Sequence, residues 1–265
     1  MQAREHDHLG SGDGRLALSV IMIVRNESSR LRRTLESISF ARECVVVDGG
    51  SDDGTPEIAR SLGAKVSNRP DWIGFGAQKQ RALELATLPW VLSIDADEVV
   101  SAALAAEIAA TIATGRHDAY SIPRLNHLCG RPVRCAGWWP DRVVRLFRRG
   151  TARFSDDVVH ERLLHDGTAG SLREPLLHDT YRSVSEAELK LARYAEDGAR
   201  SMHRSGRRCG PWAAPLHGGW MWFRSAVLRG GVLGGRDGLA VARLVALGTS
   251  LRYRRLAELS RADHR

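Results

Sequence analysis

The chain lacks the features that mark secreted and membrane-spanning proteins. Its 265 residues include four cysteines, and their spacing gives neither a Cys-x-x-Cys pair nor the framework of a small disulfide-bonded domain. No stretch is apolar and long enough to span a bilayer, because prolines and glycines interrupt the longest uncharged region, between Pro211 and Gly219. Residues 1–15 are polar and glycine-rich, without the apolar centre of a secretory signal. We therefore expect a cytoplasmic protein whose first 15 residues are disordered.

Lysine is scarce, with three lysines against 36 arginines and a formal net charge of +8. The positive charge is concentrated near the C-terminus, where nine arginines and three acids lie between Arg224 and Arg265. Four aromatic residues precede them, namely Trp212, Trp220, Trp222 and Phe223. Aromatic side chains beside cations are typical of segments that lie on an anionic membrane surface. We expect residues 206–265 to be helical, amphipathic and basic, and either to bind such a surface or to pack on the rest of the protein, because the apolar spacing fits both.

Two acids follow a predicted buried strand at spacing i, i+2. The apolar run over residues 89–93 leads into Asp95 and Asp97, so both carboxylates come at the C-terminal tip of a strand, where open α/β sheets hold their ligands. Such a pair suits a divalent cation that also contacts phosphate oxygens. An isolated pair of this kind is more often an acidic turn before a helix, and it is the surrounding segments that favour the cation site. We interpret the next acid, Glu98, as a residue of the helix start, outside the site.

The segments around these acids alternate between strands and helices. Strands are predicted over residues 18–24, 44–48, 64–66 and 90–94, and a stretch with helical spacing follows each of them. This alternation favours a parallel sheet with helices on both faces. The carboxyl edge of the sheet would then collect Asn26, Asp48 and Asp95.

Four motifs in this order, at residues 24–27, 47–55, 74–79 and 95–98, resemble those of family 2 glycosyltransferases with the GT-A fold. A closer resemblance, to bacterial lipopolysaccharide core β-1,4-glucosyltransferases, rests on residues 138–142, 145–149 and 159–161 and on the basic C-terminus. The resemblance covers about residues 16–259. It implies an α/β fold, a Rossmann-like mixed sheet with helices on both faces, over residues 16–205. Residues 16–115 would be the nucleotide-sugar half and residues 116–205 the acceptor half, followed by the basic C-terminal region.

The activity implied is inverting and metal-dependent transfer of a sugar, with UDP-glucose as the expected donor. The acceptor would be a lipopolysaccharide core or a related membrane-held glycan, which places the enzyme on the inner face of the plasma membrane. Another glycan or a protein is an alternative acceptor. A sugar nucleotidyltransferase is a further alternative, but residues 25–30 are not the glycine-rich phosphate loop that such enzymes carry. A basic nucleic-acid-binding protein is disfavoured, because acids at the strand tips would repel phosphate.

The resemblance also implies roles on the donor side. Asp48 would contact the uracil, and Asn26 and Glu27 would flank the same nucleotide. Lys79 would meet the diphosphate or the base, Asp95 would support the ribose or the cation, and Asp97 would bind Mg²⁺ or Mn²⁺ through the diphosphate. Ordinary alternatives remain for these residue types: a turn acid for Asp48, a loop or cap for Asn26, and a solvated helix face for Lys79.

Displacement at an anomeric carbon needs a carboxylate that takes the acceptor proton, because a sugar hydroxyl is a weak nucleophile. Of the candidates Asp141, Asp156, Asp157 and Glu161, we favour Glu161, which ends a short apolar segment where the family carries a His-Glu element, and Asp141 after it. His178 follows an apolar pair and would complete the metal shell, bind a phosphate or serve the core. Trp138 and Trp139 offer a stacking surface for a sugar, and we expect one of the two to face the core instead.

Overall fold

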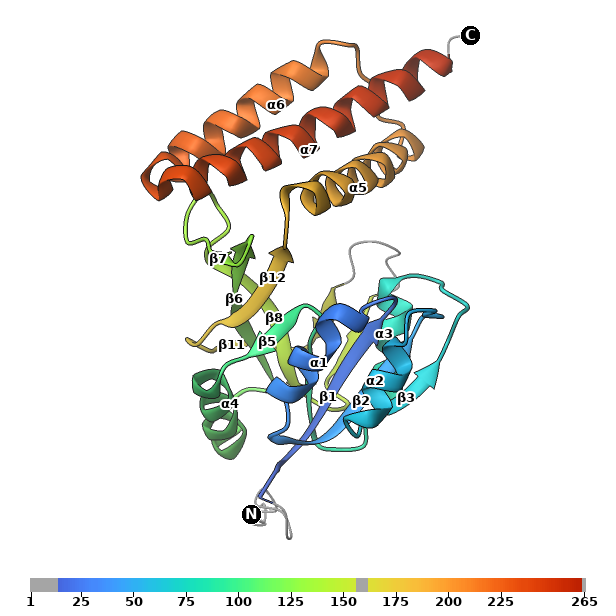
Figure 1. The fold of residues 1–265 in the computed structure, drawn as a ribbon, viewed down its shortest axis with the longest axis vertical. Coiled ribbons are helices and arrows are strands. Elements are labelled where there is room, and N and C mark those ends of the chain that lie inside the picture. The colour runs from blue at the N-terminus through green and yellow to red at the C-terminus, as the bar shows by residue number, and fades with distance from the viewer. Residues whose placement is uncertain (1–13, 156–161, 264–265) are drawn as a thin grey trace. The chain divides into compact units, whose positions relative to one another are not determined.

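The computed structural model describes residues 14–155 and 162–263 (Figure 1). Its first elements are β1 (Leu16–Val24), α1 (Ser28–Ser37), β2 (Ala41–Asp48), α2 (Thr55–Ser61), β3 (Lys65–Asn68), α3 (Phe75–Glu84), β4 (Trp90–Ser93), β5 (Glu98–Val100) and α4 (Ala102–Thr114). The strands that follow are β6 (Ala119–Leu128), β7 (Arg131–Pro132), β8 (Asp141–Arg148), β9 (Ala152–Phe154), β10 (Leu163–His165), β11 (Gly170–Ser171) and β12 (Leu176–Tyr181). The C-terminal elements are α5 (Val184–Arg204), α6 (Ala213–Phe223), the short helices η1 (Arg224–Leu228) and η2 (Val232–Gly234), and α7 (Gly235–Ala262).

The chain divides into two compact units. Unit 1 consists of Met1–Arg124 and Arg142–His178, and unit 2 consists of Leu125–Asp141 and Asp179–Arg265. The segment for which we expect disorder, residues 1–15, lies almost wholly outside the described residues.

The main sheet is mixed, with the strand order β3-β2-β1-β4-β8-β6-β12-β5. Strands β1, β2, β3 and β4 are parallel to one another, as the alternation of strands and helices predicts. The direction changes at β8, which pairs with β4 in antiparallel fashion. Because the carboxyl ends of β1, β2 and β4 meet at one edge, the loops that follow these three strands gather there.

Helices cover both faces of the parallel part of this sheet. Alternate residues of β1 point to opposite faces. Leu18, Val20 and Met22 pack in one cluster with residues of α1, α2 and α4, whereas Ile21 and Ile23 pack in a second cluster with residues of α3. The α/β prediction with helices on both faces is therefore confirmed.

Unit 2 contains the helices α5, α6 and α7, and α7 packs on the other two. Gly218 of α6 lies so close to α7 that a Cβ there would come within 1.9 Å of Ser250 Oγ. His217 stacks on Tyr253, with ring centroids 3.9 Å apart, and Gly248 of α7 faces Leu191 of α5. The predicted helical C-terminal region is thus present. None of the helices in the described part of the chain is long and apolar enough to cross a membrane.

Candidate active site

The loops after β1 and β2 are bound to each other at the carboxyl edge of the sheet. Asn26 adopts a left-handed backbone with φ 56°, which asparagine tolerates better than most residues. Its Oδ1 accepts a hydrogen bond from Asp52 N at 3.0 Å, and its own N–H donates to Ser51 Oγ at 2.9 Å. The N–H of Glu27 donates to Thr55 Oγ1 at 2.9 Å. Asn26 and Glu27, both predicted nucleotide residues, are therefore positioned by the loop after β2.

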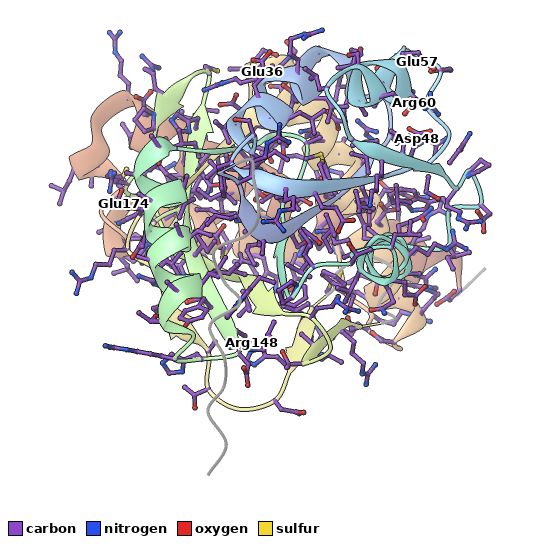
Figure 2. The ribbon with its side chains drawn as sticks, turned by 90° about the horizontal axis from the view of Figure 1, so that it is seen from below. Glu36, Asp48, Glu57, Arg60, Arg148 and Glu174 are labelled. Carbon is purple, nitrogen blue, oxygen red and sulfur yellow. The ribbon has the colours of Figure 1, made fainter. Side chains whose placement is uncertain are left out.

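Asp48 closes the turn at the end of β2. Asp48 is 1% exposed, and its Oδ2 accepts hydrogen bonds from the N–H groups of Gly50 and Ser51, each at 3.0 Å. Ser51 Oγ donates to Asp48 Oδ1 at 2.5 Å and also accepts from Asn26. In the view of Figure 2, Asp48 lies on the side of α2, whose Glu57 and Arg60 are labelled. The turn role considered from the sequence is thus present, and it links Asp48 directly to the Asn26 loop.

Asp95 lies between two buried cations just after β4. Its Oδ1 is 3.0 Å from Lys79 Nζ, and its Oδ2 accepts a hydrogen bond from Arg145 Nη2 at 2.6 Å. Burial alone would raise the pKa of Asp95, but the charges of Arg145 and Lys79 hold the pKa of this carboxyl well below its usual range. Lys79 is 4% exposed, which excludes the solvated helix face considered for it.

Glu98 corrects one sequence interpretation. It is the first residue of β5 and is fully buried, whereas the helix α4 begins later, at Ala102. Its Oε1 accepts a hydrogen bond from Arg145 Nη2 at 2.8 Å and lies 3.6 Å from Arg124 Nη1, and its Oε2 accepts from Asp95 N at 2.9 Å. Glu98 is therefore not a helix-start acid. It holds Arg145 against Asp95 beneath the site.

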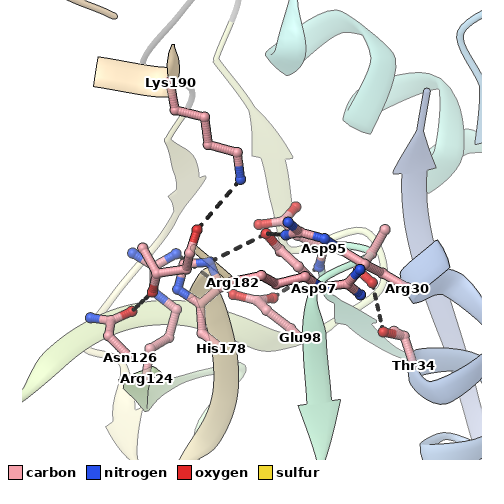
Figure 3. A network of polar contacts seen from close by, with 12 residues as sticks. Arg30, Thr34, Asp95, Asp97, Glu98, Arg124, Asn126, His178, Arg182 and Lys190 are labelled. Carbon is pink, nitrogen blue, oxygen red and sulfur yellow. Dashed lines mark hydrogen bonds and ion pairs between the residues drawn. The ribbon is translucent and has the colours of Figure 1, made fainter. Parts of the chain in front are cut away.

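Asp97 has a different environment from Asp95. Its Oδ2 is 3.2 Å from Arg30 Nη1 and 3.6 Å from His178 Nε2, as Figure 3 shows. His178 reaches this position because β12 pairs with β5, with His178 opposite Glu98. The site therefore brings together Asp97 and His178, two of the predicted metal ligands, with a cation from α1 that the sequence interpretation did not include.

The side chains at Asp97 fit a divalent ion whose other ligands come from a substrate. Adjacent ligands on an octahedral ion with bonds of about 2.1 Å are roughly 3 Å apart, so the 3.6 Å between Asp97 Oδ2 and His178 Nε2 needs little adjustment. Within residues 14–155 and 162–263, no group of three or more His, Cys, Asp or Glu side chains is placed to hold a metal. Diphosphate oxygens and water would supply the remaining ligands, which is how Mg²⁺ is commonly bound. Asp95 contacts Lys79 and Arg145 through its two oxygens, and Asp97 contacts Arg30 through Oδ2, so a divalent ion at either carboxylate would share it with a cation of the protein.

Only some of the predicted acceptor-side residues belong to the described part of the chain. Glu161, Asp156 and Asp157 fall outside the described residues. Asp141 is the first residue of β8 and belongs to unit 2. Trp138 packs against the core of unit 2, with its ring centroid 6.1 Å from that of Tyr181. The Trp139 ring has the guanidinium of Arg134 over it at 4.5 Å. Of the two tryptophans, Trp138 is therefore the one that faces a core.

The sequence interpretation missed two arginines that contact the predicted site residues. Arg145 is 4% exposed and contacts both Asp95 and Glu98, and Arg30 contacts Asp97. A signal for Arg145 was present, because it stands in the motif at residues 145–149. Arg30, on a helix with other arginines, carried no such signal.

Comparison with known proteins gives a family. The model of the family described as "Glycosyl transferase family 2" matches residues 19–163. The lipopolysaccharide core biosynthesis glycosyltransferase LpsC of Rhizobium meliloti (strain 1021) is 30% identical over 268 residues, covering 94% of this chain and 96% of its own. An uncharacterized glycosyltransferase of Rickettsia conorii is 29% identical over 258 residues, covering 92% of this chain and 90% of its own.

Solved structures show more distant likenesses. TarS of S. aureus aligns with a TM-score of 0.45 and 17% identity, covering 67% of this chain and 39% of that chain. Glucosyl-3-phosphoglycerate synthase from Mycobacterium tuberculosis, in complex with Mn²⁺, UDP and glucosyl-3-phosphoglycerate, aligns with a TM-score of 0.35 and 24% identity. That alignment covers 42% of this chain and 44% of the other.

Proposed function

The chain belongs to glycosyl transferase family 2, and we propose that it is an inverting, metal-dependent enzyme that moves glucose from UDP-glucose to a lipopolysaccharide core acceptor. Its fold is GT-A, and it is a glycosyltransferase. The donor, the metal and the acceptor are the proposed parts. One observation carries the proposal for the site: Asp97 and His178 converge beside Arg30 at the carboxyl edge of the sheet.

The donor would lie across residues 16–115, the nucleotide-sugar half. Asn26, Glu27 and the turn closed by Asp48 form one hydrogen-bonded loop pair, which gives the nucleotide a rigid edge. Asp95 stays ionised because Lys79 and Arg145 flank it, and an ionised carboxylate can accept hydrogen bonds from the ribose hydroxyls. Lys79 would help to neutralise the diphosphate from the same position.

Asp97 and His178 would hold Mg²⁺ or Mn²⁺. When bound, such an ion stabilises the negative charge that collects on the leaving diphosphate without needing to transfer a proton. Arg30 would provide a second positive charge at the same place, because it is held by Asp97 and is largely buried. Asp95 remains an alternative or additional ligand.

On the acceptor side, residues 116–205, Glu161 would take the proton of the attacking hydroxyl, with Asp141 as the second candidate. A single displacement of UDP by that hydroxyl inverts the anomeric configuration. The attack forms the new glycosidic bond as the bond to the diphosphate breaks, and the carboxylate retains the proton.

The similarity to LpsC over nearly the whole chain supports a lipopolysaccharide core acceptor. Such an acceptor is held in a membrane, and an enzyme that meets it there would work as a peripheral protein on the inner face of the plasma membrane. Another polysaccharide or a protein is the alternative acceptor, because the Rickettsia relative is named only as a glycosyltransferase.

A donor and acceptor panel tests this proposal. Purified enzyme is incubated with UDP-glucose, UDP-galactose, GDP-mannose or UDP-N-acetylglucosamine and with truncated core oligosaccharide, in Mn²⁺, in Mg²⁺ or in excess EDTA. We expect transfer from UDP-glucose, a β-linked product by NMR and no turnover in EDTA. Equal turnover in EDTA would contradict the metal proposal, an α-linked product would contradict inversion, and preference for another donor would replace glucose.

A further inference from the structure

Helix α6 presents its large apolar side chains outward. Five such residues, which we call the apolar stripe, recur at intervals of three or four along α6 and η1: Trp212, Leu216, Trp220, Phe223 and Val227. Intervals of three and four place side chains on one face of a helix. Their exposed fractions are 77%, 70%, 54%, 43% and 46%.

The face of α6 that packs on α7 carries small residues instead. Ala214 and Gly218 are buried, and Gly218 lies against Ser250 of α7. Ser225 and Ala226 continue the buried side into η1. A helix on the surface of a soluble protein normally buries its large apolar residues and exposes polar ones, so the amphipathicity of α6 is reversed.

More exposed apolar residues follow the stripe. Leu228, Val232 and Leu233 are 61%, 51% and 91% exposed, at the turn between α6 and α7. No Asp, Glu, Lys or Arg occurs from Cys209 to Phe223. A continuous exposed apolar surface of this kind marks a site of interaction with a membrane or a protein.

A row of arginines lies on the neighbouring helix α7. Arg236, Arg243, Arg254 and Arg261 are separated by 7, 11 and 7 residues, which correspond to about two, three and two turns of helix. All four are exposed, and within the described part of the chain none of them forms an ion pair or a side-chain hydrogen bond. We call this set the arginine row.

Other arginines of α7 are engaged within unit 2. Arg255 Nε is 2.7 Å from Glu196 Oε2 of α5, and its Nη1 is 2.9 Å from Glu258 Oε2. Arg252 lies against Gly198 of α5. The arginine row is therefore distinguished from Arg255, whose charge is paired with acids of unit 2.

We propose that unit 2 docks on an anionic lipid bilayer through α6, with the apolar stripe in the interfacial region and the arginine row attracted by the acidic headgroups. Tryptophan and phenylalanine on an uncharged helix face suit the boundary between headgroups and acyl chains. Attraction between the exposed row and acidic headgroups is strongest at low salt, because the Debye length, about 8 Å at physiological salt, lengthens as ionic strength falls. Charge complementarity favours this occupant over a second copy of the chain, which is itself strongly basic.

This inference rests on the proposed function, in which the acceptor is held in a membrane, and it assigns the surface that brings the enzyme there. The two sets of residues contribute to membrane binding in different ways. The apolar stripe provides binding that salt does not weaken, and the arginine row provides binding that requires acidic lipid and declines as ionic strength rises.

Vesicle co-sedimentation of the full chain tests the proposal, with vesicles of phosphatidylcholine alone or with about one third phosphatidylglycerol. We compare the wild type with a stripe variant, Trp220→Ser with Phe223→Ser, and with a row variant, Arg236→Gln, Arg243→Gln and Arg254→Gln. A matched control removes the same charge from α5 through Arg193→Gln, Arg200→Gln and Arg204→Gln. Since each near-surface cation contributes about a factor of five, the row variant should bind acidic vesicles about 100-fold more weakly at low salt.

The stripe variant should lose the binding that persists at high salt, and the α5 control should bind like the wild type. Thermal unfolding checks that each variant is folded, and we expect little change because the substituted side chains are exposed. Equal weakening by the row variant and the α5 control would overturn the arginine row as the lipid-facing set. Wild-type dimers that dissociate in the stripe variant, without vesicle binding by either, would overturn the membrane in favour of a second copy.

Sugar transfer separates this inference from the proposed function. Both variants should transfer sugar normally to a soluble, delipidated core oligosaccharide and poorly to the same acceptor embedded in acidic vesicles. Vesicle binding without any sugar transfer by the wild type would leave the docking surface standing and remove the proposed function. Normal sugar transfer, together with vesicle binding by both variants as tight as that of the wild type, would remove the docking surface and leave the proposed function standing.

Discussion

At the scale of single residues, two acids separated by one alanine have different charged neighbours. Asp95 has buried cations at both oxygens, Lys79 and Arg145, so its charge is already balanced within the protein. Asp97 is paired on one oxygen with Arg30 and lies near His178. A divalent ion at Asp97 would therefore meet an imidazole as a second ligand, and we propose the ion there.

The buried carboxylate of Glu98 gives a prediction about stability. Glu98→Gln keeps the shape of the side chain but leaves Arg145 and Arg124 with less counter-charge in a buried position. We expect the free energy of unfolding to fall by about 3 kcal/mol, because breaking a buried ion pair from one side leaves an uncompensated charge. Urea denaturation measures this, with Glu36→Gln as the control, since Glu36 forms an exposed pair with Arg32. The anchoring role would be contradicted if Glu98→Gln lowered the free energy of unfolding by less than about 0.5 kcal/mol, which is the change expected for the control.

The identity of the base gives a second prediction. Glu161→Gln should lower kcat by roughly 10²–10⁴-fold while UDP-glucose affinity stays unchanged, because the amide cannot accept the acceptor proton. Asp141→Asn should have a smaller effect on kcat. Single-turnover transfer and calorimetric donor binding separate the two parameters. An inactive Asp141→Asn beside a nearly active Glu161→Gln would transfer the role to Asp141.

The residues proposed to contact a ligand were easier to predict than the residues that position them. Asp95, Asp97 and Asn26 follow strands in the sequence, and their place at the carboxyl edge is a local property of strand and loop. The partnership of Glu98 with Arg145 joins residues 47 positions apart on different strands. It depends on how β8 and β5 are placed in the sheet, and no local pattern carries that information.

At the scale of elements, Glu43 joins the parallel strands at the end of the sheet opposite the site. On β2, it accepts hydrogen bonds from Ser19 of β1, from Lys65 of β3 at 2.6 Å, and from Thr87 before β4, with Thr87 N at 2.8 Å. Burial would raise the pKa of Glu43, but these hydrogen bonds together lower it from 4.5 to about 2. The ionised carboxylate thus stabilises four consecutive segments of the sheet.

This lowered pKa predicts a pH dependence. A carboxylate whose pKa is lower in the folded than in the unfolded protein stabilises the fold at pH values above its unfolded pKa. For Glu43 this contribution is lost as the pH falls from about 4.5 to about 2. Glu43→Gln should therefore destabilise the protein by about 1–3 kcal/mol at pH 7 and by less than half as much at pH 3. Urea denaturation at both values measures the difference. A penalty that stays the same at pH 3 would show that charge is not the source.

The strands and helices of the first half were predictable because their apolar periods are strong. The strand predicted over residues 18–24 is β1, and the helix expected through Leu104 and Ile108 is α4. Strand β5 was missed because it has only three residues, Glu98–Val100, and its pairing with β12 is what makes it a strand. Short elements of this kind are stabilised by partners distant in sequence rather than by their own propensity.

At the scale of the whole molecule, the sequence located the basic C-terminal region but not the surface that it forms. The periodicity of residues 206–265 fitted both packing and membrane binding, and within this one segment the helices combine a packed face with exposed apolar residues. Small residues such as Gly218 pack α6 on α7, while Trp220 and Phe223 remain exposed. The sequence showed only how many arginines this region contains. The structure shows which of them are exposed: Arg254 faces solvent, whereas Arg255 is paired with Glu196.

The central claim is that this family 2 glycosyltransferase moves a sugar through a metal site at Asp97. The most direct measurement is the rate of glucose transfer from UDP-glucose to truncated lipopolysaccharide core, as a function of Mn²⁺ concentration, for the wild type and Asp97→Asn. Asp118→Asn is the matched control, because Asp118 is exposed and pairs with Arg148. The account predicts Mn²⁺-dependent transfer by the wild type and the control, and a rate at least about 100-fold lower for Asp97→Asn at every Mn²⁺ concentration. Wild-type rates in Asp97→Asn, or a wild-type rate indifferent to Mn²⁺ and to its removal, would contradict it.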